Sequence, residues 1–169
     1  SSKVTVRTRA KGLLSRLAHD LEILATDVTG TATVDGDAWK TAIRFGVAGL
    51  RVVGALKGGR VDESVLSLAD REDIERRMTE AMGGAQVKVE AEGTSRERGQ
   101  LTVICPEGRQ RLDTRLRASE RAGGVVEVEG SVRLSLQALG VREIKAPLGV
   151  FKLDDQVEVA FRFTLKAAG

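Results

Sequence analysis

The adjacent residues His19 and Asp20 are the first candidates for chemistry, since His19 is the only histidine in a chain of 169 residues. A histidine beside a carboxylate can serve as a general acid and base near neutral pH. No G-x-S-x-G nucleophile motif accompanies the pair. We therefore favour a structural histidine at the start of a strand. A hydrogen bond from His19 to the polar head of a ligand is the second interpretation, and an enzyme using His19 with a carboxylate is a distant third.

Cys105 is the only cysteine, which excludes an intramolecular disulfide and any C-x-x-C site. No basic residue is placed to lower its pKa, and it ends an apolar strand face. We expect a small buried hydrophobic residue beside a turn. With one histidine and one cysteine the chain lacks the usual zinc ligand sets. We predict no catalytic residue, no metal and no cofactor.

Four arginines share one parity along a predicted strand and form a basic stripe: Arg109, Arg111, Arg115 and Arg117. Such a stripe can bind phosphates or an acidic surface. Glu127 and Glu129 lie on the polar face of the next strand and would neutralise it across the sheet. A solvated, charge-balanced face is the favoured interpretation. The alternative function is an interaction module that uses this basic outer strand face to dock an acidic partner or a membrane surface.

The composition excludes several classes of protein. There are 27 Lys and Arg against 24 Asp and Glu, a net charge of +3, and only 3% aromatic residues. Platforms that stack single-stranded nucleic acid need several aromatic side chains, so we expect no specific nucleic-acid partner. No apolar run approaches the roughly 18 residues of a membrane-spanning helix. We expect one domain over residues 1–169.

Alternation of apolar and polar residues is the strongest structural signal. It is longest over residues 126–137 and 157–166, where each segment has one apolar and one polar face. Shorter alternating segments indicate six further strands, around residues 4–6, 21–25, 43–47, 87–91, 101–103 and 112–116. Hairpin turns are expected at residues 97–99, 106–108 and 122–124.

One segment has helical rather than strand periodicity. In residues 70–82 the apolar residues Ile74, Met78 and Met82 follow a narrow helical stripe. Ser67 and Asp70 resemble a capping box, and Gly83 is a natural stop. Acidic residues alternate with arginines along the segment, so we expect a salt-bridged, exposed helix face.

About eight antiparallel strands favour closure, because a closed sheet has no exposed edges. The predicted fold class is therefore mainly β: a single extended, lipocalin-like antiparallel β-barrel with one amphipathic helix. The interior of such a barrel either fills with side chains or holds one small ligand.

Several segments, in order, resemble the YceI-like family of lipid-binding proteins. They are Gly12–Ile23 with its His19-Asp20, Val28–Asp35, Leu66-Ser67-Leu68 followed by the helix of residues 70–84, Gly99–Val103, and Leu139-Gly140-Val141 through Gly149–Val157. The resemblance covers most of the chain. It departs at Gly84-Ala85-Gln86, where the family often has Tyr-Pro, and at Cys105-Pro106, where a glycine turn is usual.

The resemblance implies a non-catalytic carrier or sequestering protein for an apolar lipid, such as a polyisoprenoid or an isoprenoid quinone, held inside the barrel. It implies the periplasm if a signal peptide was removed and the cytoplasm if not. We expect a monomer or homodimer that allows transient contact with a membrane surface. The expected ligand-binding residues are the inward faces of the longest strands, together with His19: Leu21, Ile23, Ile43, Phe45, Val128, Val132, Leu134, Val159, Phe161 and Phe163.

Overall fold

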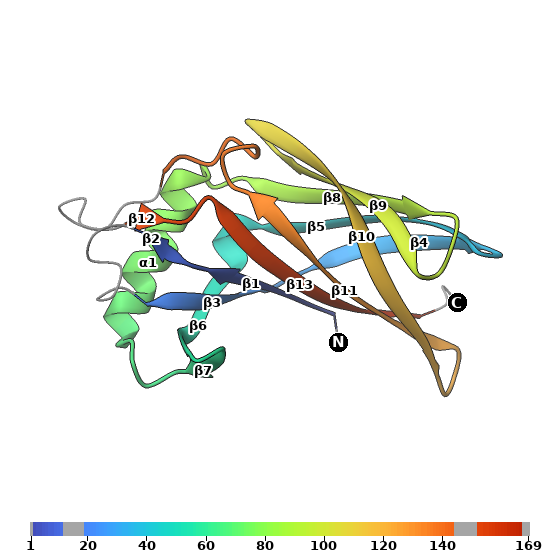
Figure 1. Ribbon diagram of the computed structural model, residues 1–169, viewed down its shortest axis with the longest axis horizontal. Coiled ribbons are helices and arrows are strands. Elements are labelled where there is room, and N and C mark those ends of the chain that lie inside the picture. Colours follow the sequence, from blue (N-terminus) through green and yellow to red (C-terminus); the bar gives the residue numbers. More distant parts are fainter. Residues whose placement is uncertain (1, 12–18, 144–151, 167–169) are drawn as a thin grey trace.

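The computed structural model describes residues 2–11, 19–143 and 152–166. Eleven strands in this part of the chain form one antiparallel sheet with the order β4-β5-β8-β9-β10-β11-β13-β1-β3-β6-β7. The sheet curls strongly on itself into a half-barrel, and one helix crosses one of its ends (Figure 1). The predicted class, a mainly β antiparallel barrel-like fold with one helix, is confirmed.

The strands of the large sheet have the following bounds: β1 Lys3–Thr8, β3 Asp20–Ala25, β4 Thr29–Asp35, β5 Ala38–Gly46, β6 Leu50–Lys57, β7 Arg60–Asp62, β8 Gln86–Gly93, β9 Arg98–Cys105, β10 Gly108–Arg121, β11 Val125–Ser135 and β13 Gln156–Leu165. Two short strands, β2 (Ala10–Lys11) and β12 (Lys152–Leu153), pair separately. All eight strands expected from alternation are present, and β4, β6 and β7 extend the sheet.

The long strands β11 and β13 pair along ten residues of each, from Val126 opposite Leu165 to Ser135 opposite Gln156. In this register Val128 lies opposite Phe163. Apolar residues of the two strands therefore share one face, as the alternation predicts.

Strand β3 continues into β4 after a short connection, and β5 continues into β6 in the same way. The two connections lie side by side and form a corner. At the corner the Thr26 backbone N–H and its Oγ1 hydroxyl both donate to the carbonyl oxygen of Gly49, at 2.9 and 2.8 Å. A Cβ on Gly49 would lie 2.9 Å from that same hydroxyl oxygen, so only glycine allows the close approach. The pair β3–β6 thus lies beside the helix, and the pair β4–β5 extends to the opposite end (Figure 1).

Helix α1 (Leu68–Ala81) covers the end of the half-barrel near β3 and β6 (Figure 1). The Ser67 side chain accepts a hydrogen bond from the Asp70 backbone N–H while the Asp70 carboxylate accepts one from Ser67, so the predicted capping box is present. Glu75 accepts a hydrogen bond from the backbone N–H of Val52 at 2.8 Å, which anchors the helix on β6. After the helix Gly83 has a φ of 67°, a left-handed conformation that ends it.

The expected ionic face of the helix is confirmed. Arg76 pairs with Asp73 and, at 2.8 Å, with Glu80, while Arg77 pairs with Asp73 at 2.7 Å. Met78 is buried on the opposite side, and Ile74 and Met82 pack against the same core.

Two details differ from the expectations. Within the described part of the chain the sheet has eleven strands, and its ladder ends at β4 and β7 instead of closing. The expected turn at residues 97–99 is wrong, because Arg98 and Gly99 lie inside β9 and the connection is residues 94–97. Part of the sequence used for the family resemblance, residues 12–18 and 144–151, lies outside the described residues.

The strand β6 was missed because a bulge breaks its alternation. The ladder between β3 and β6 shifts register between Glu22 and Ile23, so that Val53 has no direct partner. Val52 and Ala55, which differ in parity, are therefore both buried.

Candidate functional site: an apolar face that is only half covered

The inner face of the curled sheet is apolar from one wall to the other. The register connects Val132 through Val159 and Val6 to Ile23, one residue on each of four neighbouring strands. All four belong to the hydrophobic core or pack against it. The ten apolar residues expected to face inward all have the parity of this face, and all except Ile43 and Val128 belong to the same core or pack against it.

Four of these ten residues form part of the closed core. Leu21, Ile23, Leu134 and Val159 are each less than a tenth exposed. Leu21 and Ile23 pair with β6, which contacts α1. Side chains covered this completely by other protein groups mainly hold the fold together.

The other six of the ten are only half buried: Ile43, Phe45, Val128, Val132, Phe161 and Phe163. Phe45 lies next to the core, since it pairs with the buried Val87. Of the remaining five, Val132, Phe161 and Phe163 pack against the core, whereas Ile43 and Val128 are not among the residues packed against it. A half-buried apolar surface continuous with a core is a place where an apolar ligand can complete the packing.

Five more half-buried residues share the same face and were not among the predicted site residues. With the five just named they form what we call the open apolar face: Trp39, Ile43, Leu112, Leu116, Val126, Val128, Val132, Phe161, Phe163 and Leu165. Alternation within their own strands could have found Leu112, Leu116, Val126 and Leu165. Trp39 had no such signal, because the first half of β5 lacks a clear alternating pattern.

Trp39 is held in a fixed position on this face. Its indole N–H donates to the carbonyl oxygen of Ser95 at 2.8 Å. The ring lies against Gly93 and Gly99, where a Cβ would overlap ring atoms. Two glycines on β8 and β9 thus leave the space that the indole occupies.

Phe161 and Phe163 on β13 are the other aromatic residues of the open apolar face. Their ring centroids are 5.4 Å apart and the ring planes are inclined by 21°. Phe161 covers Gly130 on β11, where a Cβ would lie 2.5 Å from the ring Cζ atom. The stacked rings thus present a smooth surface to the interior.

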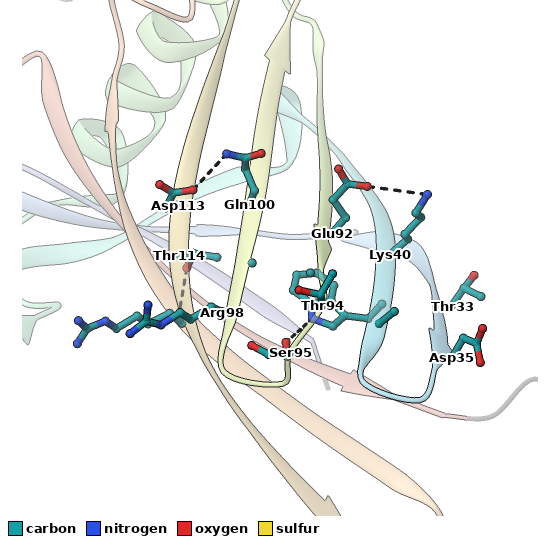
Figure 2. Close-up of a pocket in the computed structure, with 15 residues that line it drawn as sticks. Thr33, Asp35, Lys40, Glu92, Thr94, Ser95, Arg98, Gln100, Asp113 and Thr114 are labelled. Carbon is teal, nitrogen blue, oxygen red and sulfur yellow. Dashed lines mark hydrogen bonds and ion pairs between the residues drawn. The ribbon is translucent and has the colours of Figure 1, made fainter.

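One hollow lies at the ends of the hairpins away from α1, and Trp39 of the open apolar face is among the residues that line it. It has a volume of about 1110 Å³, and across it runs a row of side chains from four strands: Lys40, Glu92, Gln100 and Asp113 (Figure 2). Lys40 lies 3.9 Å from Glu92, and Gln100 donates to Asp113 at 3.2 Å. This row makes one side of the hollow polar, whereas Trp39, Gly93 and Gly99 also line it.

The remaining predicted residues are separate from the open apolar face. His19 is exposed and directly precedes β3, whose first residues lie at the α1 end (Figure 1). Cys105 is buried at the end of β9, as expected, and burial raises the pKa of its thiol. Within residues 2–11, 19–143 and 152–166 no group of three His, Cys, Asp or Glu side chains could hold a metal ion.

The basic stripe is present on the outer face, but its expected neutralisation is only partial. Glu129 pairs with Arg117 at 3.5 Å, whereas Glu127 lies opposite Ser119 and is held by Arg121 at 2.6 Å. The other arginines of the stripe lie opposite β9 instead. Among the described residues no carboxylate forms an ion pair with Arg109, Arg111 or Arg115.

Comparisons with known proteins add the fold relationship. No protein-family model and no curated protein matches the sequence. Among the solved structures that match the fold, two have a TM-score of 0.66 and 10% identity each. One is BcnA of Burkholderia cenocepacia, over 98% of this chain and 96% of that one. The other is a polyisoprenoid binding domain from Saccharophagus degradans implicated in plant cell wall breakdown, over 99% of this chain and 94% of that one.

No helix in the described ranges is long and apolar enough to cross a membrane. The half-barrel and its helix correspond over nearly the whole chain to the two solved structures. The chain therefore has the fold of BcnA and of the polyisoprenoid binding domain.

Proposed function

We propose that this protein is a non-catalytic carrier that binds an apolar lipid, of the polyisoprenoid class, along the open apolar face. The proposal rests on one observation: a continuous apolar surface is covered by other parts of the protein at one end and much less at the other. Near α1 it is closed by protein, and beyond Val132 its side chains remain half exposed. The shared fold with a polyisoprenoid binding domain supports this choice of ligand class.

The energetics suit a long, flexible hydrocarbon. If a ligand covers about 300 Å² of apolar surface, burial at roughly 25 cal/mol per Å² contributes about 7 kcal/mol before the costs of association. A branched isoprenoid chain can lie along the alternating Val, Leu and Phe side chains of β11 and β13. Such a chain needs no directional hydrogen bond, which agrees with a face made of hydrocarbon and aromatic groups.

The test uses the single tryptophan of the chain, which belongs to the proposed site. A short polyprenol added to the purified protein should shift the emission of Trp39 to shorter wavelength and saturate at one ligand per chain. Organic extraction followed by lipid mass analysis should recover an isoprenoid from protein as purified. Protein that stays free of lipid in both measurements would contradict the proposal.

A pair of variants on one strand gives the matched comparison. Phe163→Arg places a charge on the open apolar face and should lower polyprenol affinity at least tenfold. Ala160→Arg places the same group on β13 but on the outer face, where Ala160 is exposed, and should leave affinity unchanged. Equal binding by the two variants, both folded by circular dichroism, would place the ligand elsewhere.

A second candidate function is docking on an acidic partner or an anionic membrane surface through the outer face. Arg109, Arg44 and Lys88 lie in one row of the sheet, with Ile104 between Arg109 and Lys88. Arg44 and Lys88 are directly opposite, an arrangement of like charges that costs stability in isolation. An anionic surface would relieve this repulsion.

Vesicle sedimentation tests this candidate. The protein should bind vesicles containing phosphatidylglycerol more than neutral ones, and salt should weaken binding. The double variant Arg109→Glu and Arg111→Glu should abolish the difference. Equal binding to neutral vesicles, or binding by the double variant, would exclude electrostatic docking by this face.

A further inference from the structure

The edge strand β4 lacks the features that usually protect a free sheet edge. It is the first strand in the sheet order, so one side of it has no neighbour within the described residues. All seven of its residues are exposed, and Val34 on the apolar side is 62% exposed. Its sequence, TGTATVD, has no proline and no lysine. Free edges of this length are normally blocked by such residues or by a bulge, because they pair with other chains.

The turn determines which backbone groups of β4 are free. Gly36 and Asp37 form a two-residue connection between Asp35 and Ala38, which are paired. In such hairpins the residues that flank the turn exchange hydrogen bonds, and the pattern then alternates along the strand. Thr31, Thr33 and Asp35 therefore bond to β5. The N–H and C=O groups of the intervening residues, Gly30, Ala32 and Val34, are directed away from the sheet.

We propose that β4 pairs antiparallel with β4 of a second copy of this chain, around a two-fold axis at Ala32. In this register Gly30 lies opposite Val34 of the second copy, and Ala32 lies opposite its own equivalent. Each residue with free backbone groups therefore lies opposite a residue of the second copy whose backbone groups are also free. The pairing forms about six hydrogen bonds between the copies.

The apolar side chains are complementary in this register. A Cβ on Gly30 would lie 3.0 Å from Cγ1 of Ile43, so the Ile43 side chain leans over Gly30 toward the edge. Val34 of the second copy, placed opposite Gly30, meets this isoleucine and loses its exposure to water. On the outer face Thr31 lies opposite Thr33 of the second copy, a favourable cross-strand pair.

The charges are complementary as well. Asp35 lies opposite Thr29 of the second copy, and Thr29 is paired with Arg44 on β5. Arg44 directs its guanidinium toward the edge, since its Nε donates to Thr29 Oγ1 at 3.4 Å. Asp35 and Arg44 have no ionic partner among the residues described. The two-fold axis brings each Asp35 toward Arg44 of the other copy, twice in one dimer.

Backbone, apolar and charge complementarity all follow from one symmetric register, which favours a second copy over an unrelated peptide. A single pair of strands buries little surface compared with a permanent dimer. We therefore expect a reversible dimer whose population rises with protein concentration. The inference does not depend on the proposed lipid.

Sedimentation velocity over a range of concentrations tests the proposal. The wild-type chain should pass from monomer to dimer, and Ala32→Pro should remain monomeric. Proline removes only an N–H that faces away from the sheet, and edge strands tolerate it there. Ala32→Ser keeps the N–H and should dimerise like the wild type. A wild-type chain that stays monomeric, or a folded Ala32→Pro variant that still dimerises, would overturn the proposal.

Exchanging the charges of Asp35 and Arg44 tests the register. It also replaces the Ala32→Pro experiment if that variant does not fold. Asp35→Arg and Arg44→Asp should each weaken the dimer about tenfold or more, because each variant brings like charges together. The double variant should restore dimerisation. Single variants that dimerise like the wild type, or a double variant that does not recover, would rule out this two-fold arrangement.

Discussion

The indole of Trp39 lies across Gly99, a residue on a strand that does not pair with its own. The contact is made over β8, where Gly93 also lacks the side chain that would block it. Its hydrogen bond to Ser95 then fixes the ring at the end of the sheet opposite the helix. One aromatic residue and two glycines therefore shape one end of the open apolar face.

Gly99→Val should push the indole off β9, because a Cβ at this position overlaps the ring. We expect Trp39 emission to move to longer wavelength as the ring enters water, and stability to fall by about 1–3 kcal/mol. Fluorescence and urea unfolding measure the two effects. Thr102→Val, on the outer face of the same strand, is the control. An unchanged emission spectrum for Gly99→Val would contradict the position given for the ring.

We expect the buried residues of the inner face to contribute mainly to stability and its half-buried residues to contribute mainly to ligand binding. Leu134→Ala removes a buried side chain of the core and should cost about 2–4 kcal/mol of unfolding free energy. Val128→Ala, on the same strand and face but half exposed, should cost about 1 kcal/mol or less and should weaken polyprenol binding. Urea unfolding measures the loss of stability of each variant. Polyprenol titration followed by Trp39 fluorescence measures the loss of affinity. Equal losses of stability would mean that the interior is covered equally at both positions.

The capping box should stabilise α1. Ser67→Ala removes the hydroxyl that accepts the Asp70 backbone N–H, and we expect a loss of about 1 kcal/mol in unfolding free energy. Ser131→Ala, at an exposed position of β11, is the control. Because α1 holds the backbone of β6 through Glu75, hydrogen exchange at Val52 should also become faster. Unchanged exchange at Val52 would show that β6 is stable without the helix.

The connection between β11 and β13 should make stability depend on pH. The Gln137 backbone N–H donates to the Asp155 carboxylate at 2.8 Å, and the Ser135 hydroxyl donates to it at 3.1 Å. These bonds hold the pKa of Asp155 below its ordinary value. The stabilisation is therefore complete above the pKa of the unfolded carboxyl, about 3.9, and is lost as pH falls through the lower folded value.

Asp155→Asn should accordingly be less stable than the wild type at pH 7, and the difference should shrink as the pH falls below about 4. Thermal unfolding from pH 2 to pH 7 measures this. Glu107→Gln, in the exposed turn between β9 and β10, is the control. A constant difference between Asp155→Asn and wild type at all pH values would show that the carboxylate charge is not involved.

The fold class, the long strands and the helix follow from local patterns in the sequence. Residues 126–137 and 157–166 alternate strictly because one face of each strand is dry and the other wet, and this pattern needs no knowledge of neighbours. The capping box is equally local, since Ser67 and Asp70 are three residues apart. The parity of the inner-face residues was likewise correct.

The folded structure is needed to tell which inward residues are core and which are open. Leu134 and Val128 have the same parity on the same strand, and they differ only in what other segments cover them. It also decided that Glu127 meets Arg121 instead of the arginine stripe, because register depends on the turn at residues 122–124. The bulge at Val53, the free edge at β4 and the contact of Trp39 with Gly99 all depend on residues distant in sequence, whose proximity no local pattern encodes.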